Sequence, residues 1–272
     1  MGVYKNISIA RETMDIISKG EYVCKTGEKV VLPKADYSKV EVFSPKQLVA
    51  IEDDVDGIFA NRVQRSEETY FYAMDSDSLE AALNLPNALV MNFANAYQPG
   101  GGFLYGAVAQ EEALCRSSTL YASIAGREAR EMYDFNIKSR NPLVSDYMLI
   151  SPNVCVFRNP EGELLEHPYM TSVVTVPAPN RNGEARDLSF SEVNECMMNR
   201  MRRMLFLAAY KGYRHMILGA WGCGAFGNDV KDLIDIYKHL FFDEGMDELF
   251  DTICFAVYRD LEKLSRFQAE FM

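Results

Sequence analysis

The sequence predicts an α/β fold in which helices flank a mixed or parallel sheet. Short apolar runs of strand length, such as residues 88–93 and 171–176, alternate with helical patterns, the longest of which spans residues 190–211. Alternating strands and helices are typical of a sheet covered by helices. Apolar residues make up 48% of the 272 residues and aromatic residues 12%, so a large core is available.

The N-terminal quarter of the chain is predicted to be an appendage. Residues 2–19 have a helical pattern that ends near Gly20, with Lys19 in the last turn. Three short pieces follow, namely strands at 29–32 and 40–43 and a helix at 47–51. We expect residues 1–65 to form a helical and irregular extension packed on a main domain of residues 66–272.

The first half of the main domain is expected to contain three strand regions and two helices. The predicted elements are a strand at 69–73, a turn at 75–77 leading into a short helix, a strand at 88–93, a helix from Glu111 to Ile124, and two short strands within 147–158 around Ser151-Pro152-Asn153. Serine or aspartate in the first turn can cap the short helix. Asn159-Pro160-Glu161-Gly162 is predicted to be a turn.

The second half continues the alternation. The predicted elements are a strand at 171–176, helix 190–211, a strand at 215–219, a helix at 229–241, a strand at 252–258 and a helix at 261–271. In helix 190–211 an apolar stripe lies on one face and indicates core filling; its members are Val193, Met197, Met201, Met204 and Ala208. Arg200 and Arg203 are expected to lie largely off this stripe, and Gly212 to end the helix.

Charge and composition exclude several classes of protein. The net charge is −11 and the pI near 4.9, so the basic field of a nucleic-acid-binding protein is missing. No apolar stretch has the length of a membrane span, and the N-terminus lacks the apolar core of a signal peptide. An anionic ligand would need backbone N–H groups, helix N-termini and a few arginines.

Cysteine and histidine spacing favours a cytoplasmic protein without a metal site. The six cysteines are scattered with no C-x-x-C pair, which is typical of reduced, buried thiols. His167, His215 and His239 lie far apart and accompany no cysteine pair, so their spacing does not indicate metal binding.

Residues 88–116 carry the strongest functional signal. A short apolar run is followed by three consecutive glycines, Gly100 to Gly102, and then by Gln110-Glu111-Glu112 at the start of a helical segment. Consecutive glycines are costly to order, but they expose N–H groups and permit close approach, which suits a phosphate. Two carboxylates beside a phosphate would repel it, and this conflict is resolved if one of them takes part in the chemistry.

These motifs resemble the signature of poly(ADP-ribose) glycohydrolases. The similar segments are Asn92-Phe93-Ala94-Asn95, the three glycines and Gln110-Glu111-Glu112; residues 151–154, 177–180 and 218–228 resemble the microbial branch of that family. The resemblance covers roughly residues 66–260. It implies a macrodomain, a three-layer α/β/α fold with a mixed sheet.

The resemblance also implies an activity. Such an enzyme cleaves the ribose–ribose O-glycosidic bonds of poly(ADP-ribose) and releases ADP-ribose, mainly from the exposed chain end in the microbial branch. Glu112 would be the catalytic acid and Glu111 would position the substrate, with no metal or redox cofactor. Expected partners are poly(ADP-ribose), ADP-ribose and ADP-ribosylated proteins, without direct binding to nucleic acid or membrane.

The acid must be protonated for this chemistry. A free glutamate is mostly ionised at neutral pH, and a helix N-terminus favours the ionised form further. Burial, the neighbouring carboxylate and the substrate diphosphate favour the protonated form. The mechanism requires the second set of effects to dominate. The alternative is that the acidic pair has no catalytic role and only complements the helix macrodipole.

A second glycine loop follows the strand predicted at 215–219. Gly222-x-Gly224-x-x-Gly227 has the form of a dinucleotide-binding fingerprint, but only one strand–helix pair follows it, and Arg259-Asp260 lies well beyond the ~20 residues expected for a ribose-binding acid. A dinucleotide-binding dehydrogenase is therefore a poor interpretation, although glycines before a helix still suit an anion. The alternative is a tight structural turn.

By resemblance, both loops would contact ADP-ribose. The expected contact residues are Asn95, Gly100, Gly101, Gly102, Gln110, Gly222, Cys223, Gly224, Ala225, Phe226, Gly227 and Asn228. Asn95 would contact the distal ribose, whereas Asn92 on the strand is expected to satisfy buried backbone groups. Phe226 would lie against a ribose or belong to the core. Asp75 or Asp77 would receive the adenine amino group or cap a helix.

Two other functions use the same loops. One is an ADP-ribose-binding module without catalysis, and the other is a hydrolase of a different ADP-ribosyl linkage. The glycine loops serve all three functions equally. The complete Gln110-Glu111-Glu112 motif favours the glycohydrolase, because a binding module has no use for Glu112.

Overall fold

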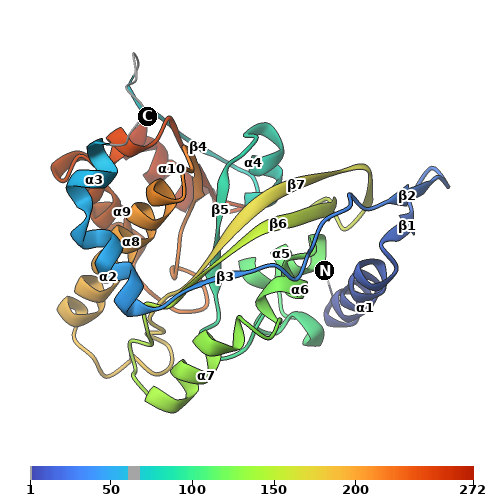
Figure 1. Ribbon diagram of the computed structural model, residues 1–272, viewed down its shortest axis with the longest axis horizontal. Coiled ribbons are helices and arrows are strands. Elements are labelled where there is room, and N and C mark those ends of the chain that lie inside the picture. Colours follow the sequence, from blue (N-terminus) through green and yellow to red (C-terminus); the bar gives the residue numbers. More distant parts are fainter. Residues whose placement is uncertain (1, 61–67) are drawn as a thin grey trace.

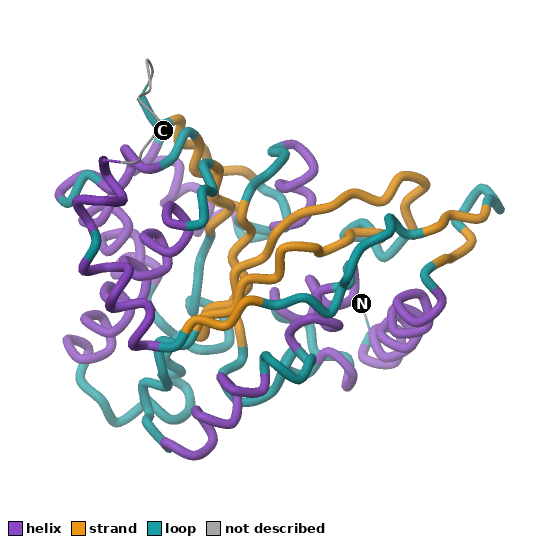
Figure 2. The backbone as a smooth tube through the Cα atoms, viewed as in Figure 1, coloured by secondary structure: helices purple, strands orange, loops and turns teal. Residues whose placement is uncertain are grey.

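The computed structural model describes residues 2–60 and 68–272, and they form three layers (Figures 1 and 2). A seven-stranded sheet lies between two layers of helices, with the strand order β3-β6-β7-β5-β8-β9-β4. The five strands from β7 to β4 run parallel, whereas β6 is antiparallel to both β7 and β3. The sheet is therefore mixed, as the alternation of elements in the sequence indicated.

The strands of this sheet are β3 (Glu41–Phe43), β4 (Tyr70–Met74), β5 (Leu89–Ala94), β6 (Met148–Arg158), β7 (Leu164–Pro177), β8 (His215–Leu218) and β9 (Thr252–Ala256). A separate hairpin consists of β1 (Glu21–Val23) and β2 (Lys29–Val31). Figure 2 shows the long β6–β7 hairpin reaching from the sheet toward this small hairpin. A cluster that includes Tyr22, Leu32 and Phe157 joins the two.

Helices cover both faces of the sheet (Figure 1). One layer contains α2 (Pro45–Asp53), α3 (Val55–Ala60), α8 (Phe190–Tyr210), α9 (Val230–Lys238) and α10 (Leu261–Phe271). The other contains α1 (Val3–Lys19), α4 (Ser78–Asn84), α5 (Gln110–Ser117), α6 (Leu120–Ile124) and α7 (Arg130–Ser139). Shorter turns are η1 (Phe103–Tyr105), the π-helical η2 (His239–Asp243) and η3 (Met246–Leu249).

The alternation of side chains along β5 separates two cores. Leu89 and Met91 point into the core with α8, whereas Val90 points into the core with α4 and α5. Successive residues of a strand face opposite sides of the sheet, so a strand that is buried on both faces is apolar throughout. The strand that precedes the first glycine loop is thus fixed from both sides.

The methionine stripe of α8 is core, as predicted, but Arg200 is not off the stripe. Arg200 is 1% exposed; its Nε donates to Asp146 Oδ1 at 2.7 Å and its Nη1 to the Pro177 carbonyl at 2.9 Å. Arg200 follows Met197 by three residues and therefore shares its face of the helix. The expectation was wrong because the partly exposed carboxylate of Asp146 and the carbonyls of Pro177 and Leu143 satisfy the guanidinium.

Two predicted boundaries were wrong because strand pairing overrides local pattern. The helix expected from Glu111 to Ile124 breaks at Ser118, whose extended backbone forms a bridge with Val156. Residues 147–158 form one strand rather than two, with a register shift between Ser151 and Val154. Helix α7 had not been predicted at all.

The predicted extension contributes to the main layers. Strand β3 pairs with β6 at one edge of the central sheet, and α2 packs on α8. The predicted domain boundary at 65/66 lies outside the described residues and stays a prediction. Among the described residues, no helix has both the length and the apolar character needed to cross a membrane.

The parallel strands all have their carboxyl ends along the same side of the sheet, perpendicular to its two edge strands. The segments that follow β4, β5, β8 and β9 meet there. Ligands of α/β proteins bind in the crevice outside the carboxyl ends of such strands. A ligand site is therefore expected at the carboxyl ends of these strands.

The buried position of Arg200 predicts a large stability cost when it is replaced. Arg200→Met should lower the free energy of unfolding by about 3 kcal/mol or more, because Asp146 loses a buried partner. Arg266→Met is the control, since its ion pair with Glu262 is exposed and worth less than about 1 kcal/mol. Urea unfolding measures both, and equal losses would contradict the structural role of Arg200.

Candidate active site

The first glycine loop begins where β5 ends. The Asn95 side-chain oxygen accepts hydrogen bonds from the N–H groups of Tyr97 at 2.8 Å and Gln98 at 2.9 Å, which turns the chain out of the sheet. Gly100 and Gly101 then adopt positive φ angles of 68° and 52°. This turn brings the loop back against the N-terminus of α5, where the two glutamates lie.

Glu111 is held by three donors from the strand and the loop. Its Oε2 accepts from the Asn95 N–H at 2.7 Å, and its Oε1 accepts from the Gly100 N–H at 3.2 Å and from Asn92 Nδ2 at 3.3 Å. Asn92 Nδ2 also donates to Thr175 Oγ1 at 3.2 Å, so it binds side chains and not the backbone groups expected from the sequence. Glu111 is 3% exposed, and the three donors fix its carboxyl group in one orientation.

Glu112 is held on one side only. Its Oε1 accepts from the Gly102 N–H at 2.9 Å, whereas its buried Oε2 has no hydrogen-bond partner among the described residues. A Cβ atom on Gly101 would lie 2.5 Å from Oε1, so only glycine permits this approach. Buried polar atoms are normally satisfied, so this oxygen remains able to accept a further hydrogen bond.

The loop thus binds the protein's own carboxyl groups. The N–H groups of Gly100 and Gly102 donate to Glu111 and Glu112, and that of Gly101 donates to the Gln98 carbonyl at 3.0 Å. The expectation that these N–H groups face a phosphate differs from the structure. Two buried carboxyl groups need hydrogen-bond donors, and the glycine loop supplies them.

Burial raises the pKa of Glu111 to about 8. The neighbouring Glu112 carboxyl acts in the same direction, while the Asn95 and Gly100 N–H groups and the Asn92 amide oppose it. Desolvation disfavours a charged carboxylate more strongly than three donors favour it here. At neutral pH the pair therefore retains a proton on Glu111.

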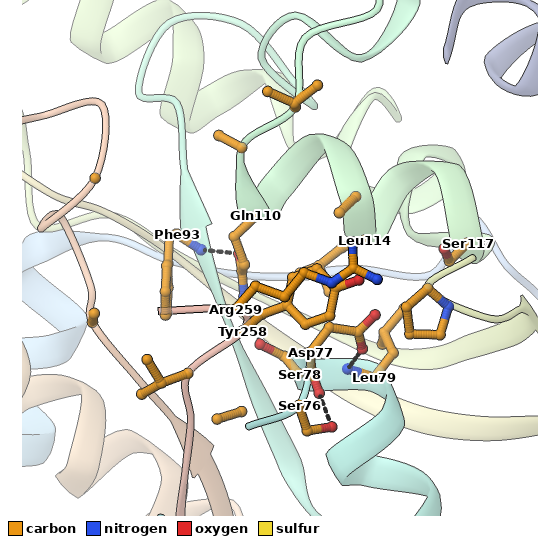
Figure 3. Close-up of a pocket in the computed structure, with 18 of the residues that line it drawn as sticks. Ser76, Asp77, Ser78, Leu79, Phe93, Gln110, Leu114, Ser117, Tyr258 and Arg259 are labelled. Carbon is orange, nitrogen blue, oxygen red and sulfur yellow. Dashed lines mark hydrogen bonds between the residues drawn. The ribbon is translucent and has the colours of Figure 1, made fainter. Parts of the chain in front are cut away.

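Gln110 joins the elements around the pair. Its Oε1 accepts from the Phe93 N–H at 2.9 Å (Figure 3). Its Nε2 donates to the Met91 carbonyl at 2.8 Å and to Ser78 Oγ at 3.1 Å. The side-chain amide is thus occupied by β5 and α4. Gln110 also lines the cavity described below, so its expected contact with ADP-ribose stays a prediction.

A cavity of about 660 Å³ lies beside α5. One end is lined by the second glycine loop, from Gly222 to Phe226, and by Phe93. Figure 3 shows Gln110, Leu114 and Ser117 along one wall, with Asp77, Tyr258 and Arg259 across from them. Glu111, Glu112, Asn95, Gly227, Asn228 and the first glycine loop do not line this cavity. The glutamates lie on the other flank of α5.

The second glycine loop leaves backbone donors free. In the described part of the chain, the N–H groups of Gly224, Ala225 and Phe226 donate no hydrogen bond. Asn228 Nδ2 donates to the Pro179 carbonyl at 2.9 Å and to the Gly222 carbonyl at 3.1 Å, which fixes the loop from inside. This loop, and not the first, has the free N–H groups of an anion site.

The two aspartates after β4 have different roles. Asp77 caps α4 by accepting from the N–H groups of Leu79 at 2.9 Å and Glu80 at 2.8 Å, and it lines the cavity. Asp75 accepts from the Arg259 N–H at 2.7 Å and does not line the cavity. Burial raises the pKa of Asp77. Of the two, Asp77 is the one placed to contact a ligand.

Several cavity residues were not found from the sequence. Tyr258 and Arg259 follow β9, and the Arg259 guanidinium lies 4.7 Å from the centre of the Tyr258 ring. Arg259 also has a positive φ of 53°, which is uncommon outside glycine and concentrates at functional sites. The parallel order of the strands was the available signal, because it places the end of β9 beside those of β8 and β4.

Arg116 was missed as well. It lines the cavity four residues after Glu112, and its Nη1 donates to the Ala107 carbonyl at 2.5 Å. The spacing of four residues on a helix was the available signal.

Among residues 2–60 and 68–272, no group of three His, Cys, Asp or Glu side chains is arranged to hold a metal ion.

The pKa of Glu111 predicts a pH-dependent stability. Since it is raised from 4.5 to about 8, the folded protein binds more protons than the unfolded chain in that window. The free energy of unfolding should therefore fall as pH rises from about 4.5 to 8, by up to about 1.4 kcal/mol per unit for this group. In Glu111→Gln this contribution should vanish.

Denaturant unfolding between pH 5 and 9 measures the effect. Glu262→Gln, at an exposed position on α10, is the control and should follow the wild type. A wild-type profile that matches that of Glu111→Gln across the window would contradict the raised pKa.

Known proteins identify the family. The model of the microbial-type PARG catalytic domain, where PARG is poly(ADP-ribose) glycohydrolase, matches residues 10–159, more than half of the chain. The structure of poly(ADP-ribose) glycohydrolase from Thermomonospora curvata is 34% identical, with a TM-score of 0.90 over 98% of this chain and 100% of that chain. Its form bound to the inhibitor ADP-HPD is 33% identical, with a TM-score of 0.84 over the same shares.

A second bacterial enzyme is also similar. Poly(ADP-ribose) glycohydrolase from Deinococcus radiodurans in complex with ADP-ribose is 34% identical, with a TM-score of 0.79 over 89% of this chain and 98% of that chain. No curated protein matches. The predicted three-layer macrodomain fold is confirmed by these matches. The chain belongs to the microbial-type poly(ADP-ribose) glycohydrolase family.

Proposed function

We propose that this enzyme hydrolyses the ribose–ribose O-glycosidic bonds of poly(ADP-ribose) with Glu112 as general acid and base. The main support is the geometry of Glu112, with Oε1 held by the Gly102 N–H and Oε2 buried without a hydrogen-bond partner among residues 2–60 and 68–272. The fixed oxygen orients the carboxyl group, and the other oxygen can meet a substrate atom. Glu111, held by three donors, positions the sugar.

In this reaction Glu112 gives up one proton and later takes one back. The Glu112 carboxyl donates its proton to the leaving ribose oxygen as the glycosidic bond breaks through an oxocarbenium-like state. The resulting carboxylate then takes a proton from the water that attacks the anomeric carbon, which restores the acid. The products are ADP-ribose and a polymer shortened by one unit.

The proton that Glu112 donates must be retained with the substrate in place. Burial raises the pKa of Glu111 to about 8, so a largely neutral Glu111 supplies little negative charge that would hold a proton on its neighbour. A bound diphosphate adds negative charge nearby, which favours the protonated forms of adjacent carboxyl groups. The mechanism therefore works best with substrate bound.

We place the rest of ADP-ribose along the sheet edge. The free N–H groups of Gly224, Ala225 and Phe226 would bind the diphosphate, with the Phe226 ring against a ribose. Asn95, whose side-chain oxygen holds the loop, would offer its Nδ2 to the distal ribose. Asp77 and the Tyr258 ring would bind adenine at the other end of the cavity.

Substrate context follows from composition and chemistry. ADP-ribosylated proteins carry the polymer that such an enzyme trims, and we propose trimming from the exposed end. The net charge of −11 disfavours binding to nucleic acid. The six cysteines are free, which fits a reducing compartment such as the cytoplasm.

The role of Glu112 predicts a separation of catalysis from binding. Glu112→Gln should lower ADP-ribose release from poly(ADP-ribose) by a factor of about 10² to 10⁴, because the amide cannot donate the proton. The dissociation constant for ADP-ribose, measured by calorimetry, should stay near that of the wild type. Binding without release by the wild type would leave a binding module or a hydrolase of another linkage.

The close approach of Gly101 predicts a second effect. Gly101→Ala should lower ADP-ribose release by at least about tenfold, because its Cβ would displace Glu112 Oε1. Gly212→Ala is a matched control with a φ of 81° and no atom within 4 Å of the added Cβ. Both should lose about 1–2 kcal/mol of stability from the backbone alone. Full activity of folded Gly101→Ala would contradict the geometry.

A further inference from the structure

The connection between the glycine loop and α5 determines where Glu112 lies. Residues 103–109 join Gly102, which donates to Glu112, to Gln110 at the start of α5. The Gly102 carbonyl accepts from the N–H groups of Tyr105 at 2.9 Å and Ala107 at 3.2 Å. A shift of this connection would therefore move the Gly102 N–H.

Helix α1 holds the connection from outside. Asn6 is 1% exposed, and its Nδ2 donates to the Gly106 carbonyl at 3.0 Å across 100 residues of sequence. Gly106 has a φ of 84°, and a Cβ there would lie 2.6 Å from the Val3 carbonyl oxygen. The first turn of α1 is thus in direct backbone contact with the connection.

A second tie reaches α5 itself. Thr13 is fully buried, and its Oγ1 donates to the Arg116 carbonyl at 2.7 Å. The Arg116 side chain returns to the connection, with Nη1 donating to the Ala107 carbonyl at 2.5 Å. Helix α1, the connection and α5 are therefore linked in a closed set of hydrogen bonds around Glu112, and Figure 1 shows α1 beside α5.

The contact between α1 and the connection is made by polar side chains, which fix a backbone position more precisely than apolar packing does. Two packed elements can be held by apolar side chains alone, whereas a buried amide or hydroxyl without its partner is costly. Hydrogen bonds fix direction as well as distance, and so they set the position of a backbone segment. Asn6 and Ile9 also line the cavity, so α1 forms part of its wall.

We propose that α1 is a positioning element of the active site, in which Asn6 and Thr13 hold residues 103–109 and α5 so that the Gly102 N–H orients Glu112. This inference rests on the proposed role of Glu112. It assigns a function to part of the N-terminal segment, in which the sequence contains no motif.

The test uses full-length variants that remove one polar atom each. Thr13→Val and Asn6→Leu should lower kcat on poly(ADP-ribose) by about tenfold to a hundredfold, since small displacements of a catalytic group have effects of this size. In Thr13→Val, whose position does not line the cavity, KM and the dissociation constant for ADP-ribose should stay near wild type. Thr13→Ser keeps the hydroxyl and should restore kcat.

Thr171→Val is the matched control. Thr171 is also buried, and its Oγ1 donates to the Ala88 carbonyl at 3.4 Å, at the start of β5 and away from the glutamates. It should lose stability but keep kcat. In a Glu112→Gln background, Thr13→Val should cause no further loss, because both changes act on the same group.

Hydrogen exchange gives a readout that does not depend on activity. The Gly102 amide should exchange faster in Thr13→Val and Asn6→Leu than in wild type. Its exchange rate should be unchanged in Thr171→Val. Unchanged exchange, or wild-type kcat in folded Thr13→Val and Asn6→Leu, would overturn the inference. An inactive wild type whose Gly102 amide responds as expected would instead refute the proposed function and leave the positioning by α1 supported.

Discussion

The proposed active site depends on two adjacent carboxyl groups that the protein buries and holds with backbone donors. Glu111 and Glu112 begin a helix, and the turn after β5 returns the N–H groups of Gly100 and Gly102 to them. Every neighbouring element serves this arrangement: β5 is fixed by two cores, and Gln110 ties β5 to α4 and α5. The burial that makes the pair costly also keeps a proton on Glu111 at neutral pH.

The two glycine loops, both of which were expected to contact ADP-ribose, use their backbone donors differently. The first loop uses the N–H groups of Gly100 and Gly102 to hold the two carboxyl groups. In the second loop, the N–H groups of Gly224, Ala225 and Phe226 donate no hydrogen bond within the described structure, which leaves them for the proposed anion. An acidic protein cannot attract a diphosphate through its overall field, so local backbone donors must hold it. Separating the carboxyl groups from the anion loop reduces the repulsion that the sequence alone suggested.

Much of this site could be predicted from the sequence, because apolar runs and glycine positions are local signals. The strand at 88–93, the capping of α4 and the core role of the methionine stripe all follow from short-range pattern. Contacts between distant segments could not be predicted in this way. The break in the helix at Ser118 depends on Val156, and the burial of Arg200 depends on Asp146. Tyr258 and Arg259 become neighbours of Asp77 only through the strand order.

The unpaired Oε2 of Glu112 has a consequence for inhibitors of this enzyme. A compound with a protonated amine in place of the scissile sugar carbon would face a carboxyl oxygen that lacks a partner in the described structure. The ammonium N–H would give this oxygen the hydrogen bond that it lacks, and its positive charge would lie where the oxocarbenium-like state develops charge. A neutral analogue of the same shape offers neither interaction, so the amine would bind more tightly.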